Sequence, residues 1–113
     1  MTRDLDDLQA RAARVGALYA ETFGITPDSA FHIGKLTEEL GELTAAHLKM
    51  TGRARHENRP EAELRRDLED EAADLFGFLL LFADWQGIDL PEAFDRKWGR
   101  YLDRDRPARP GRD

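Results

Sequence analysis

One stripe of side chains in this sequence changes from carboxylates to large apolar groups along a single helical face. Its members, at successive steps of four, three, four, three and four residues, are Asp67, Glu71, Asp74, Phe78, Leu81 and Trp85. Those steps follow the 3.6-residue period of an α-helix, which we expect over residues 60–85. Carboxylates that continue a buried stripe are desolvated and repel one another unless a positive charge compensates them. The stripe therefore predicts both a helix and a bound cation.

Helical periodicity extends over nearly the whole chain, and no segment shows the sustained alternation of a strand. We expect helices over residues 5–23 and 29–50, with a turn containing Gly24 and Pro27 between them. Gly87 is expected to end the third helix, and Pro91 to open a short fourth one. The prediction is an all-α, four-helix bundle forming one domain over residues 1–103, with a disordered tail at 104–113.

The second half of the third helix is apolar on almost every face. The residues concerned are Leu75, Phe76, Phe78, Leu79, Leu80, Leu81 and Phe82. Such a helix must be surrounded by its own domain or by a partner. A chain of 113 residues buries only a modest fraction of its surface alone. We therefore expect a core completed by homodimerisation, in a homodimer or a dimer of dimers.

Composition excludes several classes of function. The net charge of -6 disfavours a protein that binds a nucleic-acid polymer, which needs clustered lysine and arginine. The chain has no cysteine, which removes disulfides, thiolate nucleophiles and Cys-ligated zinc. Its longest apolar stretch, 75–83, is too short to span a bilayer, and residues 1–7 do not resemble a secretory signal. These features predict a protein without a membrane segment, located in the cytoplasm.

A second acidic motif lies on the predicted helix over residues 29–50. There, Lys35, Glu39, Glu42 and Ala46 form a stripe that flanks an apolar seam. The seam consists of Ile33, Leu36, Leu40, Leu43, His47 and Met50. Carboxylates three residues apart on one helix can reach the same hard cation, and two such helices supply four. The predicted ligands of Mg²⁺, with Mn²⁺ as a substitute, are Glu39, Glu42, Glu71 and Asp74.

Two simpler explanations compete with this metal site. Acidic pairs at this spacing are common on solvated helix faces, and each motif alone is unspecific. A di-iron helical bundle also places carboxylates between helices, but it requires histidine three residues after glutamate. None of His32, His47 and His56 follows a glutamate at that distance.

The two motifs together resemble a known family. The segment 35–43, KLTEELGEL, is followed by Asp70-Glu71-x-x-Asp74-Leu75 and then by Gly87-Ile88-Asp89. This arrangement, over about residues 32–101, resembles the MazG-like all-α nucleotide pyrophosphohydrolases. Members of that family use Mg²⁺ to convert nucleoside triphosphates to the monophosphate and pyrophosphate. The resemblance implies the same reaction here, by water attack on the α-phosphorus, and a role in removing nonstandard nucleotides.

Carried over by position, the resemblance assigns roles to individual residues. Glu39, Glu42, Glu71 and Asp74 become the metal ligands. Glu38 becomes the general base or a residue that supports the ligands. Lys35, Lys97 and Arg100 are expected to bind the nucleotide, with Arg96 and Arg104 as alternatives for its phosphates.

The motifs leave the substrate's base open, because every nucleoside triphosphate shares the phosphates that a metal holds. His32 either borders the nucleotide or packs, and His47 is expected to be a core histidine. Trp85 and Trp98 either stack on a base or belong to the core. The alternative function is a non-catalytic helical module for dimeric interaction or nucleotide sensing.

Overall fold

Four α-helices and one 3₁₀-helix make up the part of the chain that the structure describes. This computed structural model describes residues 2–102, with side chains from residue 4. The α-helices are α1 (Thr2–Phe23), α2 (Ser29–Met50), α3 (Glu61–Gln86) and α4 (Leu90–Lys97), followed by the 3₁₀-helix η1 (Gly99–Leu102). No strand occurs within residues 2–102, so the all-α prediction is confirmed there. The predicted tail, 104–113, lies outside the described residues.

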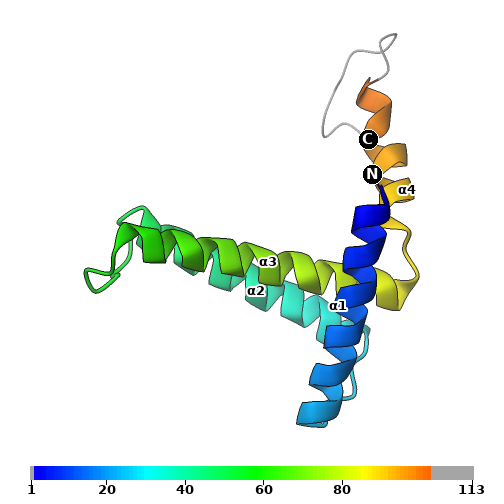
Figure 1. The fold of residues 1–113 in the computed structure, drawn as a ribbon, viewed down its shortest axis with the longest axis horizontal. Helices are drawn as coiled ribbons and strands as arrows, with labels where there is room; N and C mark the ends of the chain where they lie inside the picture. Colours follow the sequence, from blue (N-terminus) through cyan, green and yellow to red (C-terminus); the bar gives the residue numbers. More distant parts are fainter. Residues whose placement is uncertain (1, 103–113) are drawn as a thin grey trace.

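The helices form a long antiparallel hairpin crossed at one end by a third helix. Helices α2 and α3 lie side by side along the hairpin, and α1 crosses them near the end where α3 finishes (Figure 1). Helix α4 follows on the side where α1 begins (Figure 1). The molecule measures 52 × 38 × 25 Å, so it is extended for its length.

Local side-chain chemistry fixes the helix ends close to their predicted positions. Asp28 caps α2 by accepting a hydrogen bond of 2.8 Å from the Phe31 backbone N–H. Asp89 caps α4 in the same way through the Glu92 N–H, at 3.1 Å. Gly87, at a φ of 68°, ends α3 in the left-handed conformation that glycine adopts without steric cost.

Helix α3 carries most of the buried apolar side chains among the described residues. Leu64, Leu80 and Ala83 are buried there, and Leu80 is only 2% exposed. Gly16 lets α1 approach closely, because a Cβ at this position would lie 2.6 Å from the Leu81 Cδ2 atom. Helix α3 therefore packs against both α2 and α1.

The face of α2 that meets α3 differs from the predicted seam. Ile33, Leu40 and His47 are exposed, whereas His32, Glu39 and Ala46 are buried. The interpretation of His47 as a core histidine was wrong, and His32 is the buried histidine. In both rows, successive residues are seven positions apart. The helical period alone therefore does not decide which row is buried. The α2–α3 contact buries His32, Glu39 and Ala46, while half of the predicted seam, Leu36, Leu43 and Met50, is half-buried and the other half faces outward.

Among the described helices, none combines the length and apolarity needed to cross a bilayer.

Truncating the most deeply buried large side chain should weaken the fold. We expect Leu80→Ala to lower the free energy of unfolding by about 2–5 kcal/mol, because it removes packed methyl groups and leaves a cavity. Leu102, which is 84% exposed, provides the matched control. Leu102→Ala should change the free energy of unfolding by no more than about 0.5 kcal/mol. Urea denaturation of the two variants measures the difference, and equal losses would contradict this assignment of the core.

Candidate metal centre

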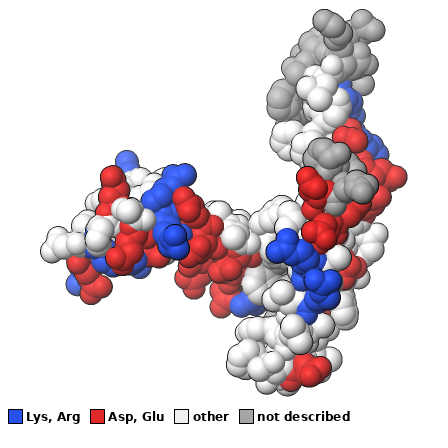
Figure 2. Space-filling view, in the orientation of Figure 1, with Lys and Arg blue, Asp and Glu red and all other residues white. Residues whose placement is uncertain are grey.

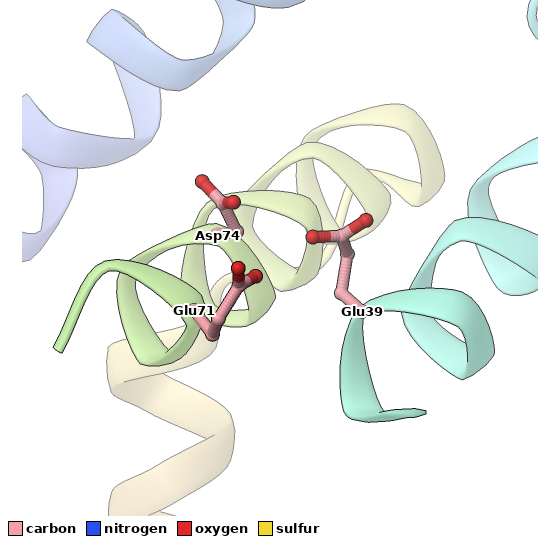
Figure 3. Close-up of side chains that lie close together, drawn as sticks. All are labelled: Glu39, Glu71 and Asp74. Atoms are coloured by element: carbon pink, nitrogen blue, oxygen red, sulfur yellow. The ribbon is translucent and has the colours of Figure 1, made fainter. Parts of the chain in front are cut away.

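Three carboxylates from two helices meet on the α2–α3 hairpin. Glu39 extends from α2, and Glu71 and Asp74 extend from α3 toward it (Figure 3). One carboxylate oxygen of each residue lies within 4.8 Å of one from each of the others. We call these three residues the acidic cluster. The three-residue spacing of Glu71 and Asp74 puts both on the α3 face opposite Glu39.

Glu39 is the most buried member of the acidic cluster, at 8% exposed. Burial raises the pKa of its carboxyl group, since desolvation penalises the charged form. Lys35, with its Nζ atom 3.8 Å from the Glu39 carboxylate, opposes that rise, while Asp74 adds to it. One lysine therefore compensates only part of the negative charge.

Glu71 is half-buried and its pKa is also raised. The largest cause is desolvation, followed by repulsion from Asp74 and Glu42. Within residues 4–102, no basic side chain forms an ion pair with Glu71 or Asp74. No ion pair among the described residues therefore neutralises these two carboxylates.

The donor set fits a hard divalent cation. All three groups offer carboxylate oxygen, the ligand that Mg²⁺ and Mn²⁺ prefer. Oxygens bound to one octahedral Mg²⁺ lie about 3–4.2 Å apart, which is inside the 4.8 Å limit for the acidic cluster. A cation held by Glu39, Glu71 and Asp74 would also supply the positive charge that the raised pKa values show to be lacking.

Glu42, the fourth predicted ligand, lies beside the acidic cluster and outside it. It lines a recess of about 60 Å³ together with Glu71, Asp67 and Lys49. Arg59 pairs with Asp67 at 2.8 Å, so the charge at that end of the recess is compensated. The structure therefore brings together three of the four predicted ligands and places Glu42 next to Glu71.

Glu38, the predicted general base, connects to the acidic cluster through Lys35. The Lys35 ammonium donates a hydrogen bond to the Glu38 carboxylate and also pairs with Glu39. The hydrogen bond to Glu38 raises the pKa of Lys35, so this side chain stays cationic. Its Nζ atom also lies 5.0 Å from the centre of the Phe78 ring.

The other two predicted nucleotide-binding residues lie in a different part of the chain. Lys97 is on α4 and lines an apolar cavity of about 740 Å³ with Leu5, Phe76 and Trp98. Arg100 is on η1, where its guanidinium lies 5.3 Å from the Tyr101 ring centre. Figure 1 shows α4 directed away from the α2–α3 hairpin. Within one chain, these two residues are not assembled with the acidic cluster.

An apolar cavity of about 410 Å³ begins at the acidic cluster and lies between α1, α2 and α3. Asp74 belongs to both the cluster and the cavity wall. Phe78, Leu81 and Trp85, which continue the carboxylate stripe along α3, also line it. The stripe found in the sequence is therefore one wall of this cavity.

Sequence reasoning missed the part that α1 plays in this cavity. Five small residues of α1 line it: Ala12, Ala13, Gly16, Ala17 and Ala20. Their clustering on one helix face is the signal that could have indicated a space between helices. In Figure 2, acidic and basic groups lie interspersed along the α2–α3 arm, whereas the lower end of the molecule, where α1 finishes, is mostly uncharged.

No model of a known protein family matches this chain, and no curated protein or solved structure matches it.

The acidic cluster should make the metal-free protein sensitive to pH. Folding raises the pKa of Glu39 and Glu71 above the ordinary value of 4.5, so the native state binds more protons than the unfolded state above that pH. The stability that these two groups contribute is fully present below pH 4.5 and is lost as pH rises through their raised pKa values. We expect Glu71→Gln to raise the melting temperature of the metal-free protein at pH 7 and to weaken its pH dependence.

The same variant should lose the rise in melting temperature that Mg²⁺ or Mn²⁺ gives the parent protein, because a ligand is gone. Glu69→Gln is the matched control, since Glu69 is an exposed residue of α3 paired with Arg65. Thermal melts with EDTA and with each cation provide the measurement. A metal response that survives in Glu71→Gln would refute the assignment of this ligand.

Proposed function

We propose that this protein is a Mg²⁺-dependent nucleoside triphosphate pyrophosphohydrolase that releases a nucleoside monophosphate and pyrophosphate. The observation that carries the proposal is the acidic cluster, in which Glu39, Glu71 and Asp74 converge from two helices. These residues are three of the four metal ligands that the MazG-like resemblance implies. Mn²⁺ is expected to replace Mg²⁺, since both accept oxygen ligands.

The surroundings of the acidic cluster support a phosphorylated organic substrate. A triphosphate is a polyanion that would be repelled by uncompensated carboxylates, so a cation between them is needed. Lys35 adds a positive charge at the edge of the cluster, and the cavity that begins at Asp74 offers apolar walls for the rest of the substrate. The proposed binding places for the phosphates and for the organic part of the substrate are therefore adjacent on α3.

The proposed reaction breaks the bond between the α-phosphorus and the oxygen that bridges to the β-phosphorus. A water oxygen forms the new bond to the α-phosphorus, and pyrophosphate leaves with the bridging oxygen. A bound divalent cation would supply Lewis-acid polarisation of the phosphate and lower the pKa of the attacking water. Glu38 is the candidate acceptor for the water proton. Its hydrogen bond to Lys35 gives it a second role, which is to hold that ammonium beside Glu39.

Hydrolysis should depend on the acidic cluster. With Mg²⁺ and a panel of nucleoside and deoxynucleoside triphosphates, the parent protein is expected to release pyrophosphate. Glu39→Gln and Asp74→Asn should each lower kcat/KM on the order of 100-fold, since each removes a charged group at the reacting phosphate. Glu69→Gln should leave it unchanged, because Glu69 is on a different face of α3.

A panel without pyrophosphate release, combined with an intact Mg²⁺-dependent rise in melting temperature, would instead favour the non-catalytic module. The two functions differ in turnover, whereas both allow metal binding. Retained activity in both cluster variants would remove the metal site from the mechanism.

We also propose that the protein is a homodimer or a dimer of dimers. Large apolar side chains are exposed on two helices in the single chain: Val15, Leu18 and Phe23 on α1, and Ile33 and Leu40 on α2. Of the large side chains in residues 4–102, none is completely buried. Exposed apolar side chains in such number are typical of a surface covered by another chain. A symmetric pair would cover the same patch on both copies.

Assembly should be visible in solution. Sedimentation equilibrium at micromolar concentration is expected to give the mass of two or four chains. Leu40→Glu places a charge in the exposed row of α2 and should shift the mass toward one chain without unfolding the helices. A well-folded parent monomer under these conditions would contradict the proposal.

A further inference from the structure

The cavity beside the acidic cluster has the size and shape of a ligand site. Its volume of about 410 Å³ falls within the roughly 300–1,000 Å³ usual for small-molecule pockets. It follows α3 from Asp74 to Trp85, a rise of about 16 Å along the helix axis. That span accommodates a phosphate, a sugar and a base in succession. Only one end of it touches the acidic cluster.

His32 provides a polar group without a protein partner in the cavity wall. This residue of α2 is 4% exposed and lines the cavity. Its Nδ1 atom is buried and has no hydrogen-bond partner within the described residues. An unsatisfied buried nitrogen of this kind costs about 1–3 kcal/mol, which a ligand that bonds to it would recover. An imidazole nitrogen can donate or accept according to its tautomer, so it suits the edge of a heterocycle.

Two aromatic rings contact His32. The Trp85 ring centre lies 5.2 Å from that of His32, and the Phe31 ring centre lies 5.5 Å away on an edge-on contact. Trp85 and Phe31 both line the cavity. Aromatic faces next to one hydrogen-bonding nitrogen match a heteroaromatic ring, which combines a π-face with polar edges.

Gly77 leaves the middle of the cavity open. It lies within α3 between Asp74 and Leu81 and lines the cavity, and a Cβ at this position would meet nothing within 4 Å. Glycine inside a helix is about 1 kcal/mol less favourable than alanine, and no neighbouring atom here requires it. A side chain at residue 77 would fill the space between the acidic end and the His32 end.

We propose that this cavity binds the sugar and base of the nucleotide, with the His32 Nδ1 atom hydrogen-bonded to the base and Gly77 keeping the passage open. The inference rests on the proposed function for its phosphate end only. His32 is then a specificity-determining residue, and Trp85 and Phe31 form the aromatic surroundings of the base.

The first test replaces the hydrogen-bonding nitrogen. His32→Leu replaces the imidazole by an apolar side chain of similar volume and so removes the polar atom. His32→Asn keeps a polar atom at the Nδ1 position. We expect His32→Leu to raise KM for the preferred triphosphate about 10-fold, to change kcat little, and to narrow the differences in kcat/KM among bases. His32→Asn should restore most of the KM and of the base ranking. The Mg²⁺-dependent rise in melting temperature should persist in both variants.

The second test fills the cavity without touching a polar group. Gly77→Leu should raise KM at least about 10-fold and leave the Mg²⁺ response intact, because it obstructs the substrate and spares the carboxylates. Gly77→Ala is the matched control and should fold at least as stably as the parent, with a smaller effect on KM.

The third test measures binding without hydrolysis. Titration of the four common deoxynucleosides and the four common ribonucleosides, followed by NMR of the Trp85 indole N–H, should show saturable shifts in the parent and weaker binding in Gly77→Leu. Nucleoside binding in a protein that hydrolyses no triphosphate would support the subsite and refute the proposed function.

Turnover with unchanged KM and base ranking in both His32→Leu and Gly77→Leu would overturn the subsite and leave the hydrolase standing. A fall in sedimentation mass in Gly77→Leu, with no change in nucleoside binding, would show that a second copy fills the cavity and would likewise overturn it. Absence of both turnover and nucleoside binding in the parent would overturn both proposals.

Discussion

Electrostatic repulsion across the α2–α3 hairpin is the constraint around which this molecule is organised. Glu39, Glu71 and Asp74 converge within 4.8 Å at the contact between α2 and α3. Burial and mutual repulsion raise the pKa of Glu39 and Glu71. The Lys35 ammonium, which pairs with Glu39, opposes this rise for Glu39. Such an arrangement weakens the hairpin unless protons or a metal ion neutralise it. A divalent cation held by these carboxylates would neutralise that repulsion.

Helix α3 carries residues of both the acidic cluster and the apolar cavity. Asp74 belongs to the acidic cluster and to the wall of the apolar cavity, and Trp85 lies at the cavity's other end. Because both are on one straight element, the distance between the charged end and the aromatic end is fixed by helix geometry. A rigid spacing of this kind suits a substrate with phosphate at one end and a flat ring at the other. Helix α1 lines the remaining side of the cavity with small residues.

Packing in the single chain leaves much apolar surface unsatisfied. The α2–α3 hairpin exposes Ile33 and Leu40, and α4 stands apart with Lys97. A second copy of the chain would cover Ile33 and Leu40. It could also change the surroundings of α4 and Lys97. The proposed assembly therefore bears on stability and on whether basic residues reach the phosphates.

The sequence by itself determined the helices, their ends and the pairing of Glu39 with Glu71 and Asp74. These features depend on hydrogen bonds and spacings within a few residues, such as the Asp28 cap and the left-handed Gly87. Only the tertiary structure decided that His32 rather than His47 is buried, that Glu42 stands beside the acidic cluster, and that α1 completes a cavity. Those outcomes depend on how each helix is rotated against its neighbours. Helical period leaves that rotation open, because adjacent rows of one helix carry similar side chains and only contacts between distant segments select among them.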